Sequence, residues 1–73
     1  MPYVNIKITR EGGPDGTGAS PEDKGRLIAG VTDLLKRVLG KDPSTTFVVI
    51  DEVDLDNWGI SGVSVKVRRS GSG

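Results

Sequence analysis

The order of apolar and polar residues along the chain predicts a strand, a helix and a second strand. In residues 3–9, Val4, Ile6 and Ile8 alternate with more polar neighbours, which is typical of a strand with one face on a core. Residues 21–39 carry leucine, isoleucine and valine at helical spacing. Residues 45–52 have a continuously apolar, β-branched centre, typical of a strand buried on both faces. We therefore expect a βαβ unit with parallel strands and a right-handed crossover.

Capping signals place the ends of the predicted helix. Ser20 is a good N-cap, Pro21 suits the first helical position, and two acidic residues follow where the helix dipole is positive. Gly40 comes directly after the last apolar position and is a common helix stop. The preceding segment, residues 11–20, contains four glycines and a proline, which predicts a flexible loop.

The C-terminal part of the chain predicts a turn and then a short arm. Residues 54–62 are rich in Asp, Asn and Gly, as turns are. Residues 69–73 have nothing to bury, so we expect a disordered tail there. The whole chain, residues 1–73, reads as a single domain of the α+β class. A short third strand or hairpin arm is predicted by alternating valines, namely Val63, Val65 and Val67.

A chain of this size needs support from outside its own core. A domain of 73 residues buries a modest share of its surface and is marginally stable alone. Without Cys or His it forms no disulfide, and we expect no metal site. One helix covers one face of a two-stranded sheet and leaves the other face open. We therefore expect a homo-oligomer.

The balance of charge and hydropathy narrows the expected partners. Ten basic and ten acidic residues give a net charge of zero, whereas a nucleic-acid-binding module carries a basic excess. No segment approaches the roughly 18 apolar residues of a membrane span, and the N-terminus lacks the apolar core of a signal peptide. We expect a cytoplasmic protein that binds neither nucleic acid nor membrane.

Several short motifs occur in an order that carries a family resemblance. Pro2 opens the first strand, SPEDK opens the helix, the second strand ends in Glu52, and NWGISG follows at residues 57–62. Over residues 2–68 the chain resembles the tautomerase superfamily, most closely its small 4-oxalocrotonate tautomerase-like members. The resemblance implies that Met1 is removed, that the proline becomes the catalytic N-terminus, and that dimers assemble further into a hexamer. It implies no cofactor.

Pro2 suits this implied chemistry. Removal of Met1 turns its nitrogen from an amide into a secondary amine, and an α-amino group has a pKa of about 7.7–8.0. Desolvation in an apolar pocket lowers that pKa and leaves a neutral base at cellular pH. Such a base takes a proton from the enol form of a small 2-oxo acid and returns it at another carbon. The alternative is that Pro2 only starts an edge strand.

Three further residues are candidates for substrate binding. Arg10 stands at the mouth of the first strand, where it either binds a substrate carboxylate or is a solvated strand-end charge. Trp58 matches the aromatic that lines the pocket in the resembled family, or it anchors a subunit interface. Asn57 either donates to a substrate oxygen or shapes the turn. The family's second-strand arginine is absent, because its position falls on Phe47, or on Val48 if the register slips by one, and both are apolar.

Two alternative functions stay open at this point. The first is a non-catalytic oligomeric protein that keeps the tautomerase fold without the active site, and the missing arginine favours it. The second is a hydratase or dehalogenase-type relative. That chemistry needs an acidic or amide group to activate water, and Glu52 and Asn57 are the obvious candidates.

Overall fold

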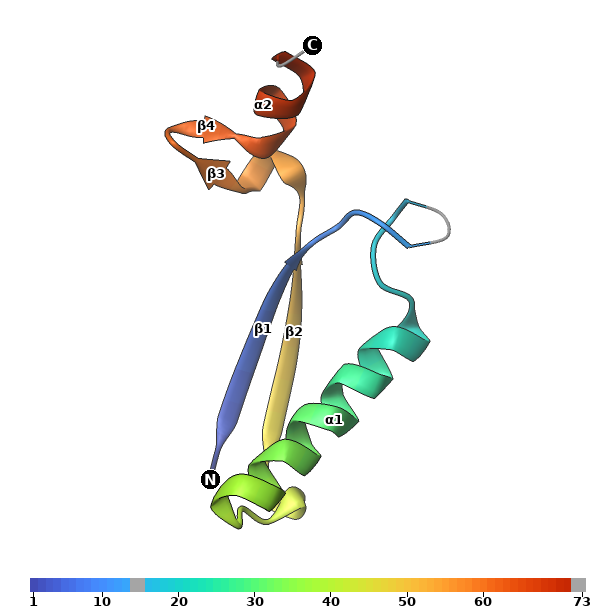
Figure 1. The fold of residues 1–73 in the computed structure, drawn as a ribbon, viewed down its shortest axis with the longest axis vertical. Coiled ribbons are helices and arrows are strands. Elements are labelled where there is room, and N and C mark those ends of the chain that lie inside the picture. The colour runs from blue at the N-terminus through green and yellow to red at the C-terminus, as the bar shows by residue number, and fades with distance from the viewer. Residues whose placement is uncertain (14–15, 72–73) are drawn as a thin grey trace.

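A computed structural model describes residues 1–13 and 16–71. It contains the predicted βαβ unit: strand β1 (Tyr3–Thr9), helix α1 (Pro21–Leu39) and strand β2 (Phe47–Val53). The chain then forms a C-terminal lobe, defined here as the short helix η2 (Leu55–Asn57), strands β3 (Gly59–Ile60) and β4 (Val63–Ser64), and helix α2 (Val65–Gly71). Figure 1 shows this lobe projecting from one end of the βαβ body.

The two long strands pair in parallel, as predicted, with Tyr3 opposite Phe47 and Thr9 opposite Val53. The second strand begins at Phe47 rather than Thr45. Its predicted first residues belong instead to a short 3-10 helix, η1 (Pro43–Thr45), because the Asp42 side chain accepts from the Ser44 N–H and caps that turn. The prediction was therefore wrong by two residues at this boundary.

The ends of α1 lie where the capping signals place them. The Ser20 hydroxyl accepts from the Asp23 N–H at 3.1 Å, and the Asp23 carboxylate accepts from the Ser20 N–H at 3.2 Å, forming a capping box. At the other end Gly40 adopts a left-handed conformation, with φ of 67°, and closes the helix. The predicted flexible loop before the helix falls partly on residues 14–15, which lie outside the described residues.

The predicted valine arm is only partly correct. Val63 lies in a strand, and the β3–β4 hairpin turns through Ser61 and Gly62, both at positive φ. Val65 and Val67 are helical instead. The physical reason is a capping residue, because the Ser64 hydroxyl accepts from the Val67 N–H at 3.2 Å and starts α2.

The tail also departs from the prediction. Arg69 lies within α2, and its guanidinium donates to the Glu11 carboxylate at 2.6 Å. This contact joins positions 58 residues apart in the chain, so it leaves no local pattern in the sequence. Helix α2 extends to Gly71, so the expected disorder is wrong for residues 69–71. Residues 72–73 lie outside the described part of the chain.

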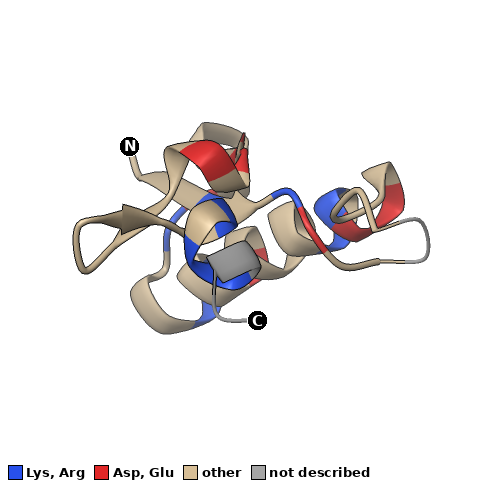
Figure 2. Cartoon of the chain, turned by 90° about the horizontal axis from the view of Figure 1, so that it is seen from above, with Lys and Arg blue, Asp and Glu red and all other residues tan. Residues whose placement is uncertain are grey.

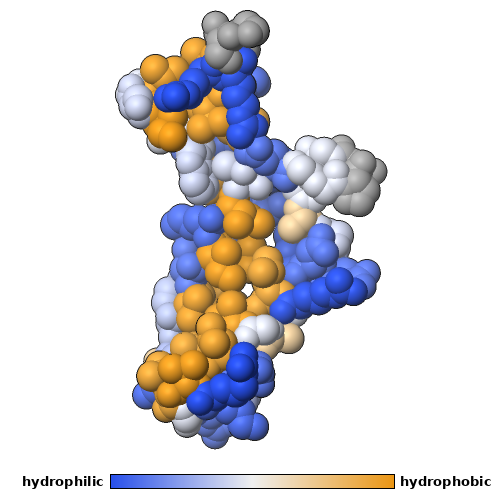
Figure 3. Space-filling model, viewed as in Figure 1, coloured by the Kyte–Doolittle hydropathy of each residue, from blue (hydrophilic) through white to orange (hydrophobic). Residues whose placement is uncertain are grey.

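One chain alone encloses little of its apolar surface. Among the described residues no hydrophobic side chain is buried, and the radius of gyration is 15.6 Å. A compact domain of this length has a radius of gyration of about 11 Å. Figure 3 shows apolar side chains open along the middle of the βαβ body and again on the C-terminal lobe. So much open apolar surface is typical of a chain that associates with others.

The face of the sheet away from α1 is the main open surface. Register and strand alternation put Tyr3, Phe47 and Val49 on this face, and these side chains are 64%, 51% and 41% exposed. The same face carries a polar cluster, in which Asn5 and Lys7 both donate to the Asp51 carboxylate, at 2.8 and 2.9 Å. We call this surface the open sheet face; it comprises Tyr3, Asn5, Lys7, Phe47, Val49 and Asp51. No helix in the described part of the chain is long and apolar enough to cross a membrane.

Candidate active site

Pro2 lies at the start of the parallel strand pair and is held there through its carbonyl. The Phe47 N–H donates to the Pro2 carbonyl oxygen at 3.0 Å, so the residue joins the sheet without using its own nitrogen. Pro2 is half-buried, whereas the preceding Met1 is 87% exposed. A proline at this position therefore loses no sheet hydrogen bond and presents its nitrogen at the end of the sheet.

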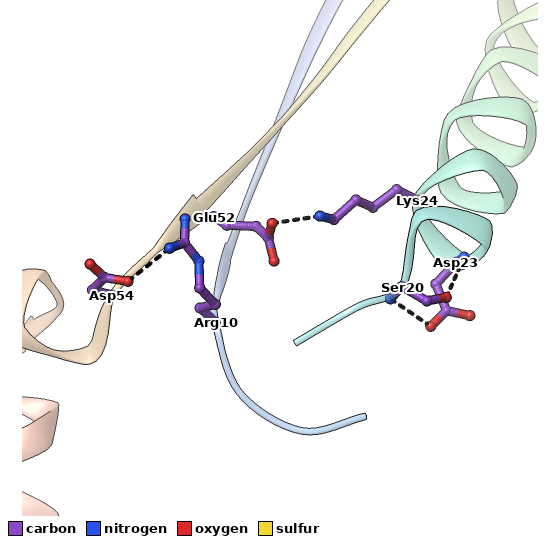
Figure 4. Close-up of polar contacts among 6 residues, drawn as sticks. All are labelled: Arg10, Ser20, Asp23, Lys24, Glu52 and Asp54. Atoms are coloured by element: carbon purple, nitrogen blue, oxygen red, sulfur yellow. Dashed lines mark hydrogen bonds and ion pairs between the residues drawn. The ribbon is translucent and has the colours of Figure 1, made fainter. Parts of the chain in front are cut away.

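A group of charged side chains lies at the opposite end of the strand pair. The Arg10 guanidinium lies 3.3 Å from the Asp54 carboxylate, and the Lys24 ammonium lies 2.5 Å from the Glu52 carboxylate (Figure 4). The Lys24–Glu52 pair ties the first turn of α1 to the end of β2. Gly18 is buried beside Glu52 and the Arg10 backbone, and a Cβ there would lie 3.0 Å from a Glu52 oxygen.

The predicted site residues do not meet within one chain. Pro2 and Arg10 flank β1, and eight residues of strand at about 3.3 Å each separate them by about 26 Å. Asn57 and Trp58 follow the far end of β2, so they lie at the Arg10 end of the molecule. A site that used all four residues would take Pro2 from one subunit and the other three from its neighbours.

Asn57 and Trp58 are positioned by the short helix η2. The Asn57 N–H donates to the Asp54 carbonyl at 2.8 Å, which closes the turn, and the Asn57 side chain is exposed. Trp58 is half-buried, and its carbonyl accepts from the Val65 N–H at 2.7 Å. Asn57 thus contributes a backbone bond to the turn, and its side chain faces solvent, as a substrate ligand on a subunit surface would.

Hydrogen bonds from cations and hydroxyls favour the ionised form of Glu52 and Glu11 at the Arg10 end of the strand pair. The Lys24 ammonium, hydrogen-bonded to Glu52, lowers the pKa of that carboxyl below its usual value of 4.5. Hydrogen bonds from Thr9 and then from Arg69 lower the pKa of Glu11 in the same way. The sequence analysis did not predict the Lys24–Glu52 and Glu11–Arg69 pairs. Neither pair has the spacing of three or four residues that joins ion pairs within a helix. Among the described residues, no group of three or more His, Cys, Asp or Glu could hold a metal ion.

Acid should weaken the link between α1 and β2. A lowered pKa of Glu52 in the folded state means that its pair with Lys24 stabilises the fold above the unfolded value near 4.5 and loses that effect as the pH falls through the folded value. Glu52→Gln should therefore lower the urea midpoint at neutral pH and flatten its decline in acid. The control is Glu22→Gln, since Glu22 forms a surface pair with 76% of its side chain exposed. Equal midpoints for Glu52→Gln and the unmodified chain at every pH would contradict this role.

Comparison with known proteins decides the family. A family model described as tautomerase enzyme matches residues 2–68. The chain belongs to the tautomerase family. It is 56% identical, over 94% of each chain, to a probable tautomerase of Dickeya dadantii. The crystal structure of DmpI from Helicobacter pylori superposes with a TM-score of 0.79, at 43% identity and covering 93% of this chain and 96% of that one.

A second solved relative is a 4-oxalocrotonate tautomerase isozyme from Methylibium petroleiphilum. It shares 31% identity, with a TM-score of 0.70, over 88% of this chain and 92% of that one. These relatives confirm both the resemblance to small 4-oxalocrotonate tautomerase-like proteins and the tautomerase fold. The chain is therefore classed among tautomerase enzymes.

Proposed function

We propose that this tautomerase moves a proton between the enol and keto forms of a small 2-oxo acid. The base, and then the acid, is the nitrogen of Pro2 after removal of Met1, and the reaction uses no cofactor. The enzyme works in the cytoplasm as one domain per chain. The observation that carries the proposal is the placement of Pro2, whose carbonyl is held by Phe47 while its nitrogen stands outside the sheet hydrogen bonds.

The proposal includes assembly of the chain into a homo-oligomer, with a hexamer as the expected form. The open sheet face and the absence of buried hydrophobic side chains in the described residues support it. In such an assembly the C-terminal lobe of one subunit lies near the Pro2 end of another. Trp58 would then exclude water from the proline nitrogen and lower its pKa by desolvation.

Water-activating chemistry of the hydratase or dehalogenase type is less well supported. It requires an acidic or amide group that activates water, and Glu52 is the acidic candidate beside the amide of Asn57. The Glu52 carboxylate is already bound to Lys24, and its lowered pKa makes it a weak base. The proposed proton-transfer reaction, in contrast, needs no catalytic group from Glu52.

Two measurements test the proposal together. Intact mass shows whether the purified chain has lost Met1, and an ultraviolet assay follows ketonisation of phenylenolpyruvate and of 2-hydroxymuconate. A chain without Met1 should turn over at least one of these enols well above the buffer rate. A processed, folded chain that accelerates neither would leave the non-catalytic alternative as the better account.

Arg10 is expected to bind the substrate carboxylate. Its guanidinium is half exposed and uses one amino group on Asp54, so further N–H donors remain. Arg10→Ala should raise KM for an acidic enol by about 10- to 150-fold, the usual effect of losing one charge-assisted hydrogen bond. Arg26→Ala, at a surface pair on α1, should leave KM unchanged. If Arg10→Ala and the control have equal KM values, Arg10 is only a solvated charge at the end of the first strand.

A further inference from the structure

The open sheet face carries opposite charges that the burial of apolar surface does not explain. The Asp51 carboxylate accepts from the Asn5 amide at 2.8 Å and from the Lys7 ammonium at 2.9 Å. Lys7 and Asp51 are opposite each other in the register of β1 and β2, so the two charges stand side by side on the face. A contact that only removed apolar surface from water would be weakened by these charges.

The polar cluster keeps hydrogen-bonding groups that one chain does not use. Both donors bond to the Oδ2 atom of Asp51, and its Oδ1 atom accepts from no residue among 1–13 and 16–71. The Lys7 ammonium has three N–H donors and uses one of them on Asp51. Hydrogen bonds from Asn5 and then from Lys7 lower the pKa of Asp51 below its usual value of 3.8, so this carboxylate is ionised at neutral pH.

These charges limit what can cover the face. In one chain the Lys7 and Asp51 side chains are 62% and 47% exposed, and a pair so open to water contributes little to stability. A covering surface removes that water, which is costly unless it brings opposite charges of its own. An apolar surface brings none. A second copy of this chain brings both, because identical faces in contact present the same lysine and the same aspartate to each other.

The charge of the whole chain gives no other basis for recognition. Ten basic and ten acidic residues cancel, and Figure 2 shows the two signs interspersed along the chain. Long-range attraction between strongly charged surfaces therefore cannot select the partner. Selection has to come from charges that meet at the contact itself.

We propose that Lys7 of one copy pairs with Asp51 of another across the open sheet face, reciprocally, and that this exchange makes the face specific for its own copy. The apolar side chains of the face supply the buried surface, and the two charges reject a surface that lacks their complement. The exchange rests on the homo-oligomer of the proposed function and is independent of the chemistry of Pro2.

The test reverses one charge at a time. Lys7→Glu places acids against acids in a contact between identical chains, and Asp51→Lys places lysines against lysines. Each variant alone should assemble with a dissociation constant raised about 100-fold or more, measured by light scattering over a dilution series. Mixed in equal amounts, the two variants pair every acid with a lysine and should recover the mass of the unmodified oligomer. With one of them isotopically labelled, native mass spectrometry should count both chains in equal numbers.

A pair of similar exposure on α1 supplies the matched controls. Arg37 and Asp33 form an ion pair with 66% and 60% of their side chains exposed. Arg37→Glu and Asp33→Lys repeat the two charge reversals away from the open sheet face, and each should keep the mass of the unmodified oligomer. The double variant Lys7→Glu/Asp51→Lys has both signs in one chain again and should assemble by itself.

The mixture distinguishes pairs between chains from a pair within one chain. The proposed exchange is wrong if either single reversal on the face keeps the unmodified mass, or if the mixture stays dissociated. A double variant that assembles while the mixture does not would show that the pair acts only within its own chain. A monomer mass for the unmodified chain would remove the exchange together with the homo-oligomer. Enol turnover is not measured in this experiment, so a failure of the proposed reaction leaves its outcome unchanged.

Discussion

A chain whose N-terminal nitrogen is blocked should show no enol turnover above the buffer rate. Retention of Met1 or chemical acylation turns the Pro2 nitrogen into an amide, which has no basic lone pair at any pH near neutrality. General acid–base catalysis by a positioned group contributes about 10²–10⁴-fold, and that whole factor should disappear. The matched control is the processed chain from the same preparation, with equal circular dichroism and equal oligomer mass. Turnover by the blocked chain at the control rate would exclude Pro2 as the base.

The pH dependence of kcat/KM should report the ionisation of the Pro2 amine. Activity should rise through one ionisation below the ordinary α-amino range of about 7.7–8.0, because desolvation disfavours the charged ammonium. Trp58→Ala should admit water to the site and move the profile to higher pH. Pro2→Ala leaves a primary amine and should lower activity without abolishing it. A profile that does not move in Trp58→Ala would return Trp58 to the role of a packing residue.

A charge placed on the open sheet face should take the assembly apart. The unmodified chain should scatter light as a homo-oligomer with the mass of a hexamer, since its exposed apolar strand face needs a cover. Val49 is 41% exposed in one chain and lies in the middle of that face. Val49→Asp would bury an unpaired carboxylate in the interface, which costs several kcal/mol. We expect a monomeric or unfolded chain at micromolar concentration, with loss of activity.

Ala29→Asp is the matched control for this experiment. Ala29 lies on the exposed face of α1, between the Glu22–Arg26 and Asp33–Arg37 ion pairs. The same added charge there costs only the difference in helix propensity, about 0.7 kcal/mol at most. This variant should keep the oligomer mass and the activity of the unmodified chain. A monomer mass for the unmodified chain, or an intact oligomer in Val49→Asp, would show that the open sheet face is not an interface.

The sequence by itself determined the features that rest on local interactions. The alternation in residues 3–9 predicted β1 with its observed bounds, and the apolar stripe with Ser20 and Gly40 predicted α1 from Pro21 to Leu39. Strand alternation and helix caps act over one to four residues, so the chain carries them in its local pattern. Pro2 became the candidate base through the family resemblance of residues 2–68, because its position after Met1 also suits a plain edge-strand start, and its role stays a prediction.

Only the tertiary structure decided how the C-terminal part of the chain is built and what it contacts. The valines at 65 and 67 suit a strand by propensity, yet the Ser64 cap and the bond from Val65 to the Trp58 carbonyl turn them into a helix. The Glu11–Arg69 pair joins residues 58 positions apart, and helix α2 packs on η2 and β4. These contacts depend on how the chain is folded in space, and residues distant in sequence carry no local sign of one another.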